Sequence, residues 1–172
     1  MQGKDHIRQA LERGARAVAL RPSVGQATAV TRVQIREGLL CEIEDGRWTL
    51  QCDMSEKGGG SGAGPDPGVY GRTALGACMA MCYVQWAARL EVPIAGVAVE
   101  VHADYDVRGE HGLDDVPAGY SQVRCHVTIE SDAREEIIRQ LVAKADSHSP
   151  YYDVFARPID LRTELKIVAP GT

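Results

Sequence analysis

The stretch that decides the fold is a glycine-rich run, Lys57-Gly-Gly-Gly-Ser-Gly-Ala-Gly-Pro-Asp-Pro-Gly68. Its six glycines and two prolines predict an irregular loop, because both residue types interrupt helices and strands. The run lacks the Gly-Lys-Ser/Thr ending of a P-loop, and its glycines do not fit the G-x-G-x-x-G register of a dinucleotide-binding turn. We therefore expect a backbone turn that passes close to another chain, and no phosphate-binding loop.

A long helix of about 22 residues, ending near Leu90, is predicted directly after this loop. It is apolar on nearly every side, through Ala74, Leu75, Ala77, Cys78, Met79, Met81, Cys82, Val84, Trp86, Ala87 and Leu90. Such a helix is normally buried within a domain or at an obligate interface. Arg72 and Arg89 lie inside its ends, and no window of the chain reaches the roughly 18 consecutive apolar residues of a membrane span. We expect no membrane partner.

The chemical centre that the helix offers is Cys78, which we expect within the first few helical turns. Partial positive charge at a helix N-terminus favours a thiolate, and a nearby arginine would favour it further. The alternative is that Cys78 is a small apolar residue in a crowded core. The amino-acid pattern alone leaves both interpretations open.

Cys82 lies one helical turn after Cys78, on the same face. A disulfide between them is geometrically poor within a continuous helix, because the two Cβ vectors do not converge. The histidines are scattered without ligand spacing, and the chain has no C-x-x-C pair. We predict no metal site and no cofactor.

On the N-terminal side of the loop, an amphipathic helix is predicted over 5–20, followed by strand-like runs at 29–35, 39–43 and 48–54. The dipeptide Asp45-Gly46 is a strong hairpin signal between the last two runs. An antiparallel meander is therefore expected from about 27 to 55. Residues 1–25 form a helical extension in this interpretation, and 26–172 form the main domain.

On the C-terminal side, alternation of apolar and polar residues predicts strands at 97–105 and 123–129. A helix follows over about 133–147, and a last strand is expected over 159–167. Strands grouped in runs and punctuated by helices are typical of an α+β fold.

Size and composition agree with one globular domain. The chain has 172 residues, of which 44% are apolar, so it can bury a sizeable core. The net charge of −5 argues against a general nucleic-acid binder. Five cysteines without framework spacing indicate a reducing compartment, so we expect a cytoplasmic protein.

The loop and the helix together resemble a known family. Gly64-Pro65-Asp66-Pro67 followed by Ala74-Leu75-Gly76-Ala77-Cys78 is similar to the segment that leads into the central helix of OsmC/Ohr proteins. Ala145-Asp146-Ser147-His148-Ser149-Pro150-Tyr151, followed by Ile159-Asp160-Leu161, resembles the second motif of that family. The resemblance covers roughly residues 27–168 and leaves the helix at 5–20 as an addition.

The resemblance implies an intertwined homodimer with antiparallel sheets around long buried central helices, and with two sites between the subunits. Active OsmC/Ohr proteins are thiol peroxidases that reduce organic hydroperoxides through a sulfenic acid, which a second cysteine resolves. The attacking cysteine of the family matches Cys78. Its activating arginine matches Arg36 best, with Arg32 as the second choice.

Two positions depart from the family pattern. The resolving cysteine corresponds to Ser149, and the acidic residue that holds the arginine corresponds to Gly68. One hypothesis is therefore a single-cysteine peroxidase that uses an external thiol reductant on a small hydroperoxide. The other is a non-peroxidase member that binds a small apolar or thiol-bearing ligand at the dimer interface.

Overall fold

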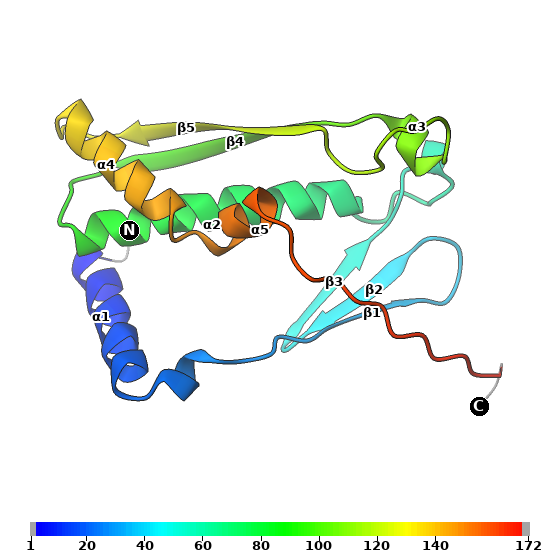
Figure 1. The fold of residues 1–172 in the computed structure, drawn as a ribbon, viewed down its shortest axis with the longest axis horizontal. Helices are drawn as coiled ribbons and strands as arrows, with labels where there is room; N and C mark the ends of the chain where they lie inside the picture. The colour runs from blue at the N-terminus through cyan, green and yellow to red at the C-terminus, as the bar shows by residue number, and fades with distance from the viewer. Residues whose placement is uncertain (1–2, 170–172) are drawn as a thin grey trace.

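The computed structural model describes residues 3–169. It contains helices together with two antiparallel sheets, as in an α+β fold (Figure 1). The N-terminal half contains helix α1 (Lys4–Leu20), a short 3-10 turn (Pro22–Gly25), strands β1 (Thr31–Ile35), β2 (Cys41–Asp45) and β3 (Trp48–Cys52), a second 3-10 turn (Glu56–Gly58) and helix α2 (Pro67–Arg89). The C-terminal half contains β4 (Gly96–Asp104), α3 (Val107–Glu110), β5 (Gln122–Glu130), α4 (Glu135–Asp146) and α5 (Pro150–Ala156). The predicted α+β class is confirmed.

The first sheet is the predicted antiparallel meander, in the order β1-β2-β3. Asp45 pairs with Trp48 at the end of the β2–β3 hairpin, so the turn residues are Gly46 and Arg47. Gly46 has φ +56°, a left-handed conformation that glycine adopts without steric cost. The hairpin predicted from Asp45-Gly46 is therefore present.

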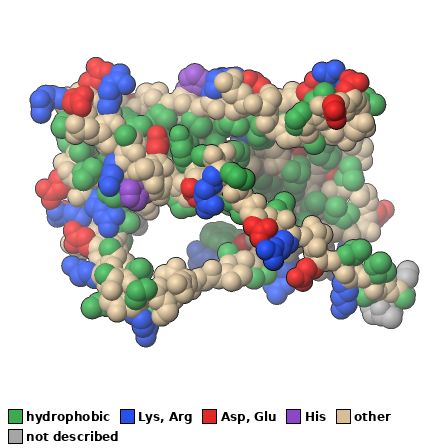
Figure 2. Space-filling view, in the orientation of Figure 1, with side chains coloured by type: hydrophobic (Ala, Val, Ile, Leu, Met, Phe, Trp, Pro, Cys, Tyr) green, Lys and Arg blue, Asp and Glu red, His purple; other side chains and the backbone are tan. Residues whose placement is uncertain are grey.

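This sheet has one apolar face that is largely exposed within the described chain. The face is formed by Val33, Ile35, Ile43, Trp48 and Leu50, and we call it the meander face. Trp48 is 60% exposed and Val33 is 55% exposed. In Figure 1 the meander lies apart from α2, and in Figure 2 hydrophobic side chains line the hollow between the two layers.

The core lies between α2 and the second sheet, which pairs β4 with β5 in antiparallel register. Leu75, Met79 and Tyr83 of α2 are buried under the valines of this sheet. Leu141 and Ala145 of α4 have no exposed surface and close the core from the other side. Helix α1 reaches this body through an ion pair between Arg8 and Glu91. No helix within residues 3–169 is both long and apolar enough to cross a membrane.

The glycine-rich loop is organised around Asp53, which is 2% exposed. Its carboxylate accepts hydrogen bonds from the backbone N–H groups of Met54, Ser61 and Ala63 and from the Ser61 hydroxyl, at 2.7–3.2 Å. The hydrogen bond from the Ser61 hydroxyl is the main reason that the pKa of Asp53 lies below its usual range. A Cβ on Gly60 would lie 2.1 Å from the Met54 carbonyl oxygen, so glycine is required there.

Helix α2 follows the glycine-rich loop directly, as predicted, and begins at Pro67, because Asp66 caps it by accepting from the Val69 N–H at 2.8 Å. Two details differ from the sequence predictions. Pro150 starts the additional helix α5. The strand predicted over 159–167 is wrong for the single chain, since that segment has no ladder partner among the described residues.

Candidate functional site

Cys78 lies on the side of α2 that meets the connection between α4 and α5. Its Sγ is 3.5 Å from the Oγ of Ser149, and either group can donate the hydrogen bond. Ser149 is 1% exposed, whereas Cys78 is half-buried. The structure therefore places a partly accessible thiol against a fully buried hydroxyl.

Cys78 lies too far along the helix for the charge at the helix end to act on it. Because α2 begins at Pro67, Cys78 lies near the middle of a 23-residue helix. Helix-end charge acts within the first turn and does not reach that far. The argument that the N-terminus of α2 activates Cys78 was therefore wrong, and any activation must come from side chains around it.

Cys82 completes this group, which we call the Cys78 cluster (Cys78, Cys82 and Ser149). The Cys82 thiol donates to the His148 carbonyl oxygen at 3.8 Å. Burial is the main cause that raises the pKa of Cys82, the negative charge of an ionised Cys78 raises it further, and the Ser149 hydroxyl lowers it in part. Cys82 is thus held as a neutral thiol at neutral pH.

Two contacts hold the Ser149 segment against α2. The Tyr83 hydroxyl donates to Oδ1 of Asp146 at 2.7 Å, and the His148 ring lies 4.9 Å from the Trp86 ring between centroids. Burial, followed by the contact with Asp146, raises the pKa of Tyr83. These contacts come from residues of the second sequence motif, whose packing role the sequence pattern did not reveal.

The structure does not bring Arg36 or Arg32 to Cys78 within one chain. Arg36 lies exposed in the β1–β2 connection, with its Nη2 3.3 Å from the Gln34 side chain and its Nε 3.8 Å from the Glu42 carboxylate. Arg32 lies in β1 opposite Glu44. A role for either arginine at Cys78 would need a second copy of the chain.

Gly68 lies in a crowded place. A Cβ there would be 2.9 Å from Nη1 of Arg72 and 3.1 Å from the Asp66 carboxylate. The same Nη1 donates to the Tyr120 hydroxyl at 3.1 Å. A side chain at position 68 would require the Arg72 guanidinium to shift. Arg72 was not selected from the sequence, although it lies one helical turn after Gly68.

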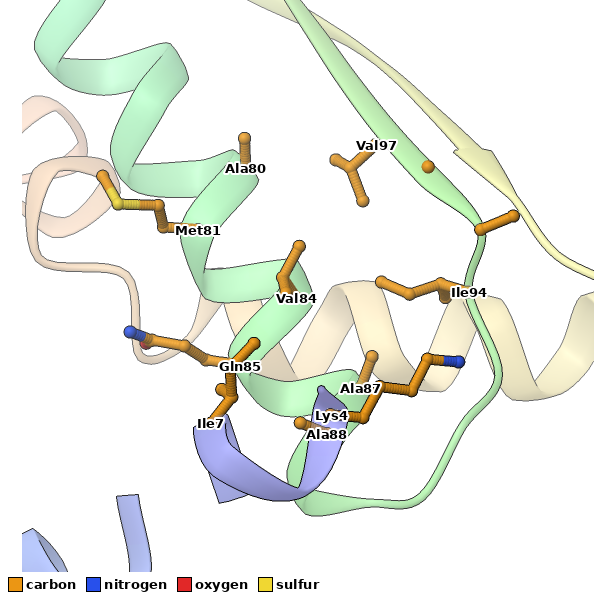
Figure 3. Close-up of a pocket in the computed structure, with 12 residues that line it drawn as sticks. Lys4, Ile7, Ala80, Met81, Val84, Gln85, Ala87, Ala88, Ile94 and Val97 are labelled. Carbon is orange, nitrogen blue, oxygen red and sulfur yellow. The ribbon is translucent and has the colours of Figure 1, made fainter. Parts of the chain in front are cut away.

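A separate apolar cavity of about 460 Å³ lies on another side of α2 (Figure 3). Met81 and Val84 of α2, Ile94 and Val97 near the start of β4, and Ile7 of α1 line it. Cys78 is not among the lining residues. Within residues 3–169, no group of three or more histidine, cysteine or acidic side chains is arranged to hold a metal ion.

Comparison with known proteins agrees with this architecture. The family model for OsmC-like protein matches residues 58–164, which include α2 and the whole Cys78 cluster. No curated protein sequence matches the chain.

Solved structures share the fold at low identity. An OsmC-like protein from Mycoplasma pneumoniae aligns with TM-score 0.65 and 15% identity, over 76% of this chain and 88% of the other. An organic hydroperoxide resistance protein, OsmC, from Legionella pneumophila aligns with TM-score 0.58 and 19% identity, over 76% and 90%. One from Elizabethkingia anophelis aligns with TM-score 0.57 and 14% identity, over 76% and 89%. With the family model spanning more than half of its length, this chain belongs to the OsmC-like protein family.

Proposed function

We propose that the protein is a thiol-dependent organic hydroperoxide reductase in which Cys78 is the single reacting cysteine. The observation that carries the proposal is the half-buried Cys78 thiol, 3.5 Å from the hydroxyl of the buried Ser149. Two relatives in fold are organic hydroperoxide resistance proteins, which supports the choice of substrate class.

In the first step the Cys78 thiolate attacks the terminal oxygen of the hydroperoxide. The sulfur–oxygen bond forms as the O–O bond breaks, so Cys78 becomes a sulfenic acid and the substrate leaves as an alcohol after taking up a proton. The Ser149 hydroxyl lies where it can donate a hydrogen bond to the sulfur during this step.

The second step requires a thiol from outside the chain. Ser149 has no sulfur, and Cys82 lies on the same continuous helix, where a disulfide with Cys78 is poorly aligned. One external thiol condenses with the sulfenic acid, releasing water and leaving a mixed disulfide. A second thiol then releases Cys78 and leaves as the small-molecule disulfide. We place this chemistry in the cytoplasm, where thiol reductants are abundant.

The proposed working form is a homodimer. The uncovered meander face supports this, because an apolar patch of this kind on a folded chain marks an interaction surface. A second copy that covers the face would also allow Arg36 of one chain to approach Cys78 of the other. In that arrangement the guanidinium would stabilise the attacking thiolate.

The test measures consumption of cumene hydroperoxide by the purified protein with dithiothreitol as reductant, together with intact-mass detection of oxidised Cys78. We expect turnover in the wild type and in Cys125→Ser, and none in Cys78→Ser. Arg36→Ala should lower the rate of Cys78 oxidation about 10-fold or more, as expected for the loss of a charge-assisted hydrogen bond worth about 1.4 kcal/mol. Oxidation of wild-type Cys78 no faster than that of free cysteine would contradict the proposal.

The apolar cavity supports a second candidate function, binding of a small apolar ligand without peroxide chemistry. Its volume of about 460 Å³ lies within the range of small-molecule sites. An apolar fluorescent probe should then bind with equal affinity to the wild type and to Cys78→Ser, and Met81→Lys should abolish binding. Probe binding that is lost in Cys78→Ser would count against this candidate.

A further inference from the structure

The outward face of the second sheet carries two histidines side by side. His102 lies on β4 and His126 on β5, and their ring centroids are 4.8 Å apart with the ring planes inclined at 70°. Glu100 is the direct register partner of His126, so it shares this face with both rings. We call these three residues the His102 cluster. Ligand spacing along the chain gives no sign of it, because antiparallel register alone brings the two histidines together.

The His102 cluster is open to solvent. The opposite face of the same strands, which includes Val99, Val101 and Val127, packs against the core under α2. His102 and His126 are both exposed. This polar face is not the meander face, and the proposed dimer leaves it uncovered. An ion in solution can therefore reach the two rings in the single chain and in the dimer.

A hydrogen bond determines which nitrogen of His102 is free. Its Nε2 lies 2.7 Å from Oε1 of Glu100. An ionised carboxylate can only accept, so Nε2 carries the hydrogen and Nδ1 keeps its lone pair. Histidines that bind metals usually donate their other N–H to a carboxylate in this way, which orients the ring and raises its basicity. Glu100 thus prepares the Nδ1 of His102 as a ligand.

The spacing of the two rings suits a shared metal ion. An ion about 2.0–2.1 Å from one nitrogen of each ring would lie about 3.2 Å from each ring centroid. At ligand angles between roughly 90° and 109°, the two centroids would then be about 4.5–5.3 Å apart. The observed separation of 4.8 Å lies within this range. The two histidines therefore need little movement to bind one ion.

The charges around the His102 cluster favour a cation. Arg124 is the register partner of His102, but its Nη2 donates to Oδ1 of Asp104 at 2.9 Å and its charge is matched there. Glu100 adds a negative charge that no arginine or lysine of residues 3–169 neutralises through an ion pair. The local balance is thus negative beside the two rings.

We propose that His102 and His126 bind one divalent transition-metal ion of the Ni²⁺, Cu²⁺ and Zn²⁺ class, with Glu100 holding His102 in place. Imidazole nitrogen suits these ions, whereas Mg²⁺ and Ca²⁺ prefer oxygen ligands. No third side chain within residues 3–169 completes the set, so water fills the other positions. The site shares no residue with the Cys78 cluster and goes beyond the proposed peroxidase reaction.

Nuclear magnetic resonance of the full-length wild type with substoichiometric NiCl₂ tests which histidines bind. The chain has five histidines, and their ring C–H signals report on each one separately. We expect the paramagnetic ion to shift or broaden the signals of His102 and His126, and to leave those of His6, His111 and His148 unchanged. An effect centred on His148, which lies beside the cysteines, would overturn the proposal. So would unchanged signals for all five at one equivalent.

Isothermal titration calorimetry with NiCl₂ measures the affinity and needs no peroxidase activity. We expect one ion per chain, and binding weaker by about 10-fold or more in His102→Gln and in His126→Gln. Glu100→Gln should also weaken binding by about 10-fold, because it removes the carboxylate that orients His102. His111→Gln is the matched control and should bind as the wild type does.

Equal affinity in the wild type and His126→Gln would overturn the metal site. Magnesium chloride should give no binding heat, and binding of Mg²⁺ to the same residues would contradict a nitrogen site. The wild-type resonance experiment decides the matter even if a variant folds poorly. Loss of peroxidase activity in Cys78→Ser leaves all of these outcomes unchanged, so the two proposals can fail independently.

Discussion

Ser149 is the residue at which the proposed reaction departs most from a two-cysteine mechanism. Its hydroxyl lies 3.5 Å from the Cys78 sulfur and is almost completely buried. A hydroxyl can donate a hydrogen bond to a thiolate but cannot form a covalent bond with a sulfenic acid as a thiol does. In the proposed reaction, Ser149 therefore stands where a resolving cysteine would lie, but it cannot resolve the sulfenic acid.

Restoring sulfur at this position should restore the internal reaction. We expect Ser149→Cys to form a disulfide with Cys78 in nearly every chain after one equivalent of cumene hydroperoxide, because the two side chains need to approach by only about 1.5 Å to reach a disulfide bond length of about 2.05 Å. Peptide mapping after alkylation measures the link. The matched control is Ser147→Cys, an exposed position nearby, which should remain unlinked to Cys78.

At the scale of elements, the loop between β3 and α2 determines where α2 starts. The Asp53 carboxylate accepts hydrogen bonds from the backbone of the loop. The Tyr70 hydroxyl of α2 donates to the Gln51 carbonyl oxygen of β3 at 2.6 Å. The loop is thus a structured connection, and its glycines provide room for the backbone to fold back on itself.

Gly60 is the tightest point of this loop. We expect Gly60→Ala to lower the free energy of unfolding by about 2–3 kcal/mol, because its Cβ would overlap the Met54 carbonyl group and force the loop open. Gly119→Ala is the matched control, since a Cβ there meets nothing within 4 Å. Urea unfolding followed by circular dichroism compares the two. Equal midpoints would show that the loop does not have this backbone path in solution.

The carboxylate of Asp53 should make stability depend on pH. Its pKa is lowered in the folded chain, so its contribution is fully present above the unfolded value of about 3.9 and is lost as the pH falls through the lower folded value. Asp53→Asn should therefore be less stable than the wild type at pH 7, with the difference shrinking toward pH 2. Urea midpoints across this range measure it, with the exposed Asp115→Asn as control. A difference that stays constant with pH would contradict the assignment.

At the scale of the whole molecule, the chain contains two layers that do not cover each other. The body formed by α2, β4, β5 and α4 has a core, whereas the meander face is open and the segment after α5 is extended, with Leu161 91% exposed. A second copy of the chain can cover an open apolar sheet face, and it can pair with a segment of alternating apolar and polar residues that has no strand partner.

The meander face therefore predicts a dimer, and a single charged side chain placed on that face should weaken the dimer. Leu50→Lys should weaken dimerisation by about 100-fold or more, because each lost leucine contact costs about 2 kcal/mol and the dimer contains it twice. Thr49→Lys lies on the opposite, polar face and should leave the dimer intact. Sedimentation equilibrium measures both variants. Equal association of the two would exclude the meander face from the interface.

Much of the local structure could be predicted because it depends on neighbours in the chain. The alternation in 39–43 and 48–54, with glycine at position 46, predicted the hairpin almost to the residue. The same rule failed at 159–167, because alternation predicts the ability to pair while a strand also requires a free edge within reach. The cap at Asp66 was not predicted, because this residue lies inside a glycine-rich run that is typical of a loop.

The sequence by itself determined the α+β class, the order of the main elements and the place of Cys78 on the long helix, since each is encoded by patterns within a short stretch of chain. Only the tertiary structure decided that Cys78 lies mid-helix against Ser149, 71 residues away, that Arg36 does not reach it within one chain, and that Arg72 crowds Gly68. The physical reason is that contacts between distant segments depend on how buried faces pack together, and that packing is decided by all the elements at once.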